Sequence, residues 1–109
     1  MTLLVGIGCA VMVVLLGVHF YEMRDPYVQQ VLADQGNVEL GREIFQVNCA
    51  ACHGIEGDGV VGPSLKAVSD RKSKLGLIHQ VVSGETPPMP KFQPSPETMA
   101  DLLSYLESL

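Results

Sequence analysis

Hydrophobic residues fill the start of the chain without interruption. From Thr2 through Tyr21, 20 consecutive residues include no Asp, Glu, Lys or Arg. A helix of this length spans about 30 Å, which is the thickness of the hydrocarbon core of a bilayer. His19 and Phe20 lie near the end of the run, and aromatic rings favour the membrane–water interface. The pattern predicts a transmembrane anchor at residues 1–21.

A cleaved signal peptide is the alternative interpretation of this segment. No Lys or Arg precedes the apolar stretch, which is too long for the apolar region of a signal peptide, and no A-x-A motif follows it. We therefore expect an uncleaved anchor. Gly6, Ala10 and Gly17 would let a second helix pack closely, although a lone anchor also tolerates them. Only Arg24 lies near either end, so charge gives little guidance on orientation.

Residues 22–36 form a connector that is expected to be partly helical. Asp25 is a suitable N-cap, Pro26 fits the first helical position, and Gly36 is a suitable end. Alternatively, the segment continues the anchor helix and bends at Pro26.

Three further helices are predicted in the globular part, residues 37–109. Asn37 caps the first, the second covers 73–83 and ends at Gly84, and the third opens at Pro96. No convincing alternating strand is present, so the predicted fold class is all-α. Apolar positions recur at helical spacing in the first helix and again in the third: Leu40, Ile44, Phe45 and Val47, then Met99, Leu102, Leu103 and Leu106.

Composition limits what this chain can be. Its 109 residues leave room for one small domain beside the apolar run, and it has three Phe, three Tyr and no Trp. A domain of that size usually needs a stabilising link in addition to its hydrophobic core. A multidomain enzyme is excluded. The net charge of −5, from 7 Lys and Arg against 12 Asp and Glu, argues against a nucleic-acid partner.

The most specific motif is C-x-x-C-H, at Cys49-Ala50-Ala51-Cys52-His53. Two thiols three positions apart lie on one side of a helical turn, where they can add to the two vinyl groups of one haem. His53 follows directly and would supply an imidazole nitrogen to the iron. This spacing is the attachment signature of c-type haem.

Other interpretations of the cysteines account for less of the sequence. A zinc site needs four ligands, and only His79 remains after Cys49, Cys52 and His53. A thioredoxin-like redox pair would need a strand–helix–strand setting, and two simply buried cysteines would not explain the flanking residues. Those flanks are four glycines and a proline, which allow tight turns close to a flat ligand: Gly54, Gly57, Gly59, Gly62 and Pro63.

The iron of a haem is bound from both sides of the ring, and two parts of the sequence bear on these ligands: the stretch that ends at Pro63 and a proline-rich loop. The carbonyl of Pro63 can accept a hydrogen bond from the second ring nitrogen of His53. Met89 lies in a segment that holds five of the seven prolines, which makes the loop stiff and reduces the entropy lost when a weak thioether binds. We expect Met89 to be the sixth ligand. The alternatives are Met99, His79, a lysine or an open position.

The motifs CAACHG, VGPSL and TPPMPKF and the final helix DLLSYLESL resemble those of class I c-type cytochromes. The resemblance covers residues 37–109, and with the anchor and DPYVQQVL it is closest to the membrane-bound cytochromes of cyanobacteria. It implies a class I cytochrome c fold around one covalent haem c with His53 and Met89 on the iron. It also implies that Gly41 and Phe45 of the first helix meet Tyr105 of the last.

By the same resemblance, the protein is an electron carrier and not an enzyme, in photosynthetic or respiratory electron transport. The haem domain would face the lumenal or periplasmic side of a thylakoid or plasma membrane. The implied partners are the lipid bilayer and redox proteins such as a quinol-oxidising cytochrome complex, a terminal oxidase, a photosystem or another small carrier. A basic cluster can steer an acidic partner, although such runs are more often solvated surface: Lys66, Arg71, Lys72 and Lys74.

Two other functions are compatible with these residues. One is a permanent haem c subunit of a larger membrane oxidase or reductase, in which Gly6, Ala10 and Gly17 would contact partner helices. The other is an enzyme or ligand sensor with an open iron position, which would require that Met89 is not a ligand.

Overall fold

The chain folds into helices joined by loops, with no strand, in a computed structural model that describes residues 1–109. The all-α fold class is therefore confirmed. The elements, in chain order, are α1 (Thr2–Met23), α2 (Pro26–Ala33), α3 (Val38–Asn48), α4 (Ala50–His53), the 3₁₀ helix η1 (Val68–Asp70), α5 (Lys74–Ser83) and α6 (Pro96–Ser108).

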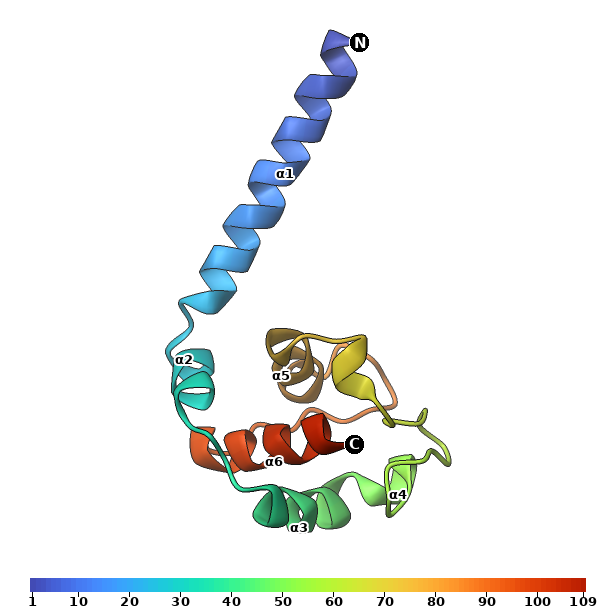
Figure 1. The fold of residues 1–109 in the computed structure, drawn as a ribbon. Helices are drawn as coiled ribbons and strands as arrows, with labels where there is room; N and C mark the ends of the chain where they lie inside the picture. Colours follow the sequence, from blue (N-terminus) through green and yellow to red (C-terminus); the bar gives the residue numbers. More distant parts are fainter.

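Helix α1 extends away from the other helices as a single rod (Figure 1). None of its residues is buried, and a Cβ at Gly6 or Gly17 would meet no atom beyond the neighbouring backbone of α1 itself within 4 Å. Its length and its mean hydropathy of 2.5 are those of a helix that can cross a membrane, and a signal sequence has the same properties. The structure thus contains the apolar helix that the sequence predicts.

Helix α2 is separate from α1 and does not continue it. The Asp25 side chain accepts a hydrogen bond from the Tyr27 N–H at 2.9 Å, with Pro26 at the first helical position, as predicted. The helix ends at Ala33, three residues before the predicted end at Gly36, because Asp34 is already extended. The Tyr27 hydroxyl donates to the Pro94 carbonyl at 2.9 Å and so fastens α2 to the loop before α6.

The core is built around α6, which lies between α3 and α5 (Figure 1). All four apolar positions predicted for this helix are buried. Helix α3 crosses α6 at Gly41, where the backbones approach too closely for a side chain. Next to this crossing, the rings of Phe45 and Tyr105 pack with centroids 5.2 Å apart. The three residues implied by the resemblance therefore meet.

The buried face of α3 differs from the one that the apolar pattern predicts. Gly41 and Phe45 are buried, and Ile44 is half-buried. Leu40 is 49% exposed and Val47 is 84% exposed. The expectation that these two belong to the packed face was wrong, because the close crossing at Gly41 turns the Gly41–Phe45 side of the helix toward α6.

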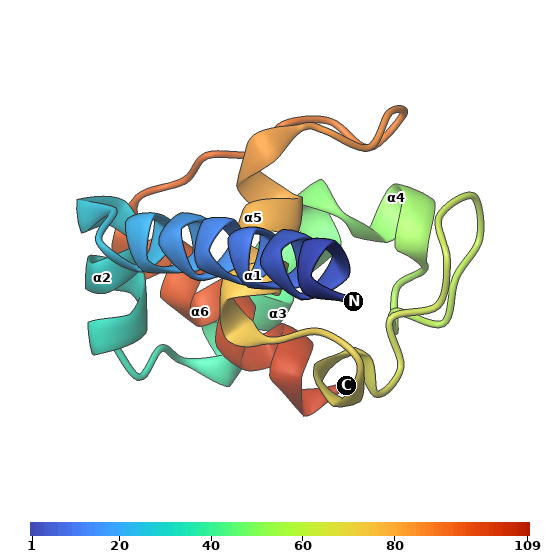
Figure 2. The same ribbon diagram turned by 90° about the horizontal axis from the view of Figure 1, so that it is seen from above.

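Two long loops carry the remaining residues of interest. One connects α4 to η1 over residues 54–67, and the other connects α5 to α6 over residues 84–95. Figure 2 shows both loops at the periphery of the helices, one beyond α4 and the other beyond α5. Hydrogen bonds between each loop and the helix beside it determine where the residues of that loop lie.

Candidate functional site

The two cysteines and the histidine of the motif occupy one short turn. Helix α3 ends at Asn48, and Cys49 leaves the helical conformation with φ of −123°. The carbonyl of Cys49 then accepts from the N–H groups of Cys52 at 3.2 Å and His53 at 3.0 Å. Cys49 is half-buried and Cys52 is exposed, and both thiols are free. The break at Cys49 was not predicted, since the helical pattern runs on through the motif.

The electrostatic setting of Cys49 favours a neutral sulfur. Burial, and secondly the proximity of Cys52, raises the pKa of the Cys49 thiol from 9.0 to about 11. No cluster of three or more His, Cys, Asp or Glu side chains is arranged to hold a metal ion. The zinc interpretation therefore has no support.

The ring of His53 is held in one orientation. Its Nδ1 lies 2.9 Å from the Pro63 carbonyl oxygen, which can only accept a hydrogen bond. Nδ1 must therefore carry a proton, and in the neutral ring Nε2 is the nitrogen whose lone pair can bind a metal. A Cβ at Gly62 would lie 2.7 Å from His53 Cε1, so only glycine leaves room for this ring.

The loop that carries Pro63 is fixed by its own backbone. The N–H of Gly59 donates to the His53 carbonyl at 2.7 Å, and the N–H of Gly62 donates to the Cys52 carbonyl at 2.6 Å. Gly59 has a φ of +94°, and a Cβ there would lie 2.9 Å from the Ser64 nitrogen. These contacts return the chain to the motif and bring Pro63 against His53.

Arg71 closes the same loop from its far end. Its guanidinium donates to the carbonyls of Ser64 at 2.8 Å and Lys66 at 2.9 Å. Lys74, from the same basic cluster, pairs with Glu107 at 3.7 Å. Two of the four cationic side chains of the cluster are thus engaged within the domain. No sequence pattern indicates this role of Arg71, because the acceptors are backbone carbonyls.

Met89 lies on the second loop, which is fastened to α5. The Phe92 N–H donates to the Val81 carbonyl at 3.0 Å, and the Met89 N–H donates to the Thr86 carbonyl at 3.0 Å. Gly84 ends α5 with a φ of +67°, as predicted, and a Cβ there would lie 2.9 Å from Lys91 Cβ. Met89 is half-buried against the core.

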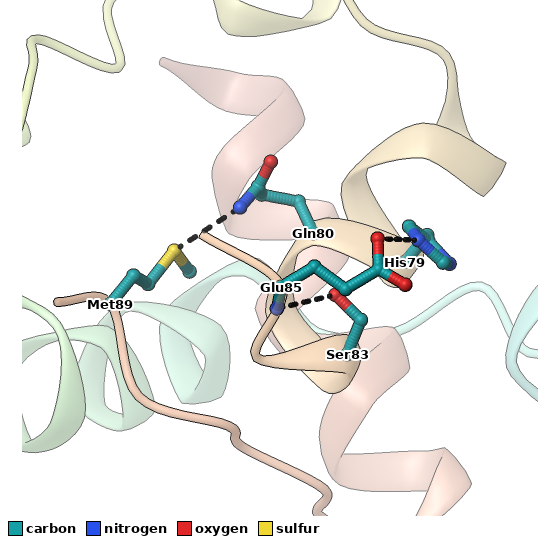
Figure 3. A network of polar contacts seen from close by, with 5 residues as sticks. All are labelled: His79, Gln80, Ser83, Glu85 and Met89. Carbon is teal, nitrogen blue, oxygen red and sulfur yellow. Dashed lines mark hydrogen bonds and ion pairs between the residues drawn. The ribbon is translucent and has the colours of Figure 1, made fainter. Parts of the chain in front are cut away.

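Figure 3 shows the side chains around this loop, with Met89 and His79 on opposite sides of α5. Gln80 Nε2 lies 3.6 Å from Met89 Sδ. His79 points the other way and contacts Glu85, with 3.0 Å between Nε2 and Oε2. Met99 is fully buried in α6. Of the side chains considered as a sixth ligand, His79 and Met99 are therefore engaged elsewhere. Sequence reasoning missed Gln80 as the polar residue beside the Met89 sulfur.

Comparison with known proteins places these features in a family. A family model described as "Cytochrome C oxidase, cbb3-type, subunit III" matches residues 36–106. The chain is 64% identical to a Synechocystis protein named "Cytochrome c-553-like" over 85 residues, which cover 78% of this chain and 81% of the relative. It is 35% identical to "Cytochrome c550" of Pseudomonas aeruginosa over 94 residues, covering 79% and 62% of the two chains. A shorter match to "Cytochrome c-550" of Bacillus subtilis is 60% identical over 42 residues, covering 38% and 35%.

Proposed function

Because this chain belongs to the c-type cytochromes and carries covalent haem c, we propose that it is a membrane-anchored one-electron carrier with His53 and Met89 as its iron ligands. Residues 37–109 would form the haem domain, residues 1–21 the anchor, and residues 22–36 the connector between them. Its relatives are cytochromes c, so its partners are redox proteins.

The residues of the motif fit this group. Both thiols are unpaired and come from one turn, as attachment to two vinyl groups requires. Glycine at position 62 leaves space beside the His53 ring. When bound, haem c supplies an iron that exchanges one electron between its ferric and ferrous states.

The contact between His53 and Pro63 is the observation that carries the proposal. The hydrogen bond at 2.9 Å fixes the proton on Nδ1, so that Nε2 is the donor atom and its basicity is increased. Met89 is a neutral thioether on a stiff loop, and a His and Met pair favours the ferrous state. Two protein ligands leave no open position for a substrate, which supports electron transfer as the activity.

Helix α1 supports the anchoring part of the proposal. None of its residues is buried, and it has no charged residue from Thr2 through Tyr21. A tether of this kind confines a carrier to the membrane surface and raises its effective concentration near membrane-bound partners. We propose a thylakoid or plasma membrane with the haem domain on the lumenal or periplasmic side. A quinol-oxidising complex or another small carrier would be the donor, and a terminal oxidase or a photosystem the acceptor.

Visible spectra of two methionine variants test the ligand assignment. Met89→Leu should change the spectrum, lower the reduction potential and let the reduced protein bind carbon monoxide. Met99→Leu preserves volume in the core and is the matched control, which should retain the parent spectrum. An unchanged spectrum in Met89→Leu would exclude Met89 as a ligand, and carbon monoxide binding by the parent would favour the enzyme or sensor alternative.

Acid–organic extraction tests which cysteines attach the haem. We expect haem to be released from the Cys49→Ser, Cys52→Ser double variant and retained by Cys9→Ser, which changes the third cysteine of the chain. Retention in the double variant would contradict attachment at these two residues.

A permanent subunit of a larger membrane complex is the second candidate function. The family model that matches residues 36–106 is itself described as an oxidase subunit, which favours this alternative. Extraction in a gentle detergent followed by sizing distinguishes the two. A stable large complex would count against a free carrier, whereas a small particle would support one.

A further inference from the structure

Gln80 is the residue of α5 whose side chain reaches the sulfur of Met89 (Figure 3). Its Nε2 lies 3.6 Å from Sδ, and both side chains are half-buried. The two ends of the Gln80 amide are not equivalent toward this partner. A thioether has lone pairs and no hydrogen to donate, so the N–H₂ end must face the sulfur.

The backbone alone leaves the Met89 side chain free to turn. The loop is anchored by the Phe92 N–H on Val81 and by the Met89 N–H on Thr86, and neither contact touches the side chain. Methionine has three rotatable bonds and adapts easily to its surroundings. A hydrogen bond to Sδ therefore supplies an orientation that the loop does not.

The other polar contacts in this region act elsewhere. His79 contacts Glu85 at 3.0 Å, and Ser83 Oγ accepts from the Glu85 N–H at 3.3 Å. Both contacts hold the start of the loop, and neither involves the sulfur. Among these side-chain contacts between α5 and the loop, only the one from Gln80 reaches the sulfur of Met89.

We propose that Gln80 is a positioning residue for Met89, a proposal that rests on the assignment of Met89 as an iron ligand. Its amide occupies one lone pair of Sδ and leaves the other for the iron. Gln80 would therefore orient the ligand.

The expected effect is modest and directional. Loss of one neutral hydrogen bond should reduce the ratio of Met89-bound to Met89-free ferric protein by about 2- to 10-fold. Free imidazole competes with Met89 for the iron, so its apparent affinity should rise by the same factor.

The experiment uses the full-length haem-loaded chain and measures imidazole binding to the ferric form. Gln80→Leu removes the donor, and Gln80→Glu keeps the side-chain shape while an ionised carboxylate cannot donate. Both should bind imidazole more tightly than the parent. His79→Leu changes the neighbouring residue, which contacts Glu85 and not the sulfur, and should leave the imidazole affinity at the parent value.

A double-mutant cycle with Met89→Ala separates positioning from a general structural effect. In the Met89→Ala background, Gln80→Leu should no longer change imidazole affinity. The proposal is overturned if both Gln80 variants match the parent, if His79→Leu has an equal effect, or if the Gln80→Leu effect persists without Met89. If Met89→Ala itself leaves the spectrum unchanged, the ligand assignment fails, and the proposed function fails with it.

Discussion

The crossing of α3 and α6 at Gly41 allows a prediction whose sign depends on two opposing effects. Substitution with Ala would place a Cβ against the Asp101 carbonyl oxygen, 2.7 Å from the Asp101 carbonyl carbon and 2.8 Å from Tyr105 Cβ. Two of these atoms belong to the backbone of α6, so they cannot rotate away as a flexible side chain can. The two helices would have to separate.

The magnitude follows from three contributions. Replacing Gly with Ala inside a helix is worth about 1 kcal/mol of stabilisation. Overpacking against backbone costs about 3 kcal/mol, at the upper end of the usual range. Separating the helices also loosens the Phe45–Tyr105 pair, whose rings are 5.2 Å apart, and such pairs contribute about 1 kcal/mol. The net expectation for Gly41→Ala is a loss of about 2–3 kcal/mol in the free energy of unfolding.

Guanidinium chloride unfolding of the haem-loaded chain in detergent, followed by circular dichroism, measures this loss. Gly76→Ala is the matched control, because Gly76 is also helical and a Cβ there would approach only a side-chain atom, Ser73 Oγ, at 3.2 Å. The helix preference for Ala and this contact with the capping Ser73 oppose each other, so that variant should stay within about 1 kcal/mol of the parent. If Gly41→Ala lost no more stability than Gly76→Ala, the close crossing and the reasoning built on it would be refuted.

Three further outcomes are expected. Burial, and secondly Asp25, raises the pKa of Tyr27 above 10.0, so its contribution to stability is present below pH 10 and is lost as the pH rises through the raised value. Tyr27→Phe should lower the free energy of unfolding by about 0.5–1.5 kcal/mol at pH 7. It should also reduce the decrease in this free energy at alkaline pH, which denaturation at several pH values would measure. Arg71→Met removes both contacts with the loop carbonyls and should lower the free energy of unfolding by about 1–2 kcal/mol in the same assay. An unchanged free energy would contradict the role assigned to Arg71. Gly62→Ala should displace the His53 ring, lower the yield of haem-loaded protein and shift its reduction potential in voltammetry.

Local sequence signals predicted most of the helix ends. Asp25 and Asn37 each accept a hydrogen bond from a backbone N–H in the first turn of the helix that follows, and α6 begins at Pro96. Gly84 ends α5 in the left-handed region. These ends were predictable because a cap depends on the chemistry of one residue and its next few neighbours, and not on distant parts of the chain.

Features that depend on distant neighbours were less accessible to sequence reasoning. The apolar pattern of α3 includes Leu40 and Val47, which are exposed, because the helix face is selected by the crossing at Gly41. Arg71 appeared as one of several surface cations until its acceptors, two backbone carbonyls, were located. Gln80 has no motif of its own, and its importance follows only from its position beside Met89.

The candidate ligands occupy separate elements, and α6 is the support that these elements share. His53 ends α4, which directly follows α3, and α3 packs on α6 through Gly41. Met89 lies on a loop fastened to α5, which packs on α6 as well. The relative positions of the two ligands are therefore set through α6, although neither ligand belongs to it. A change that moves α3 relative to α6 should alter iron ligation as well as stability. Gly41→Ala should accordingly raise the imidazole affinity of the ferric protein, whereas Gly76→Ala should leave it unchanged.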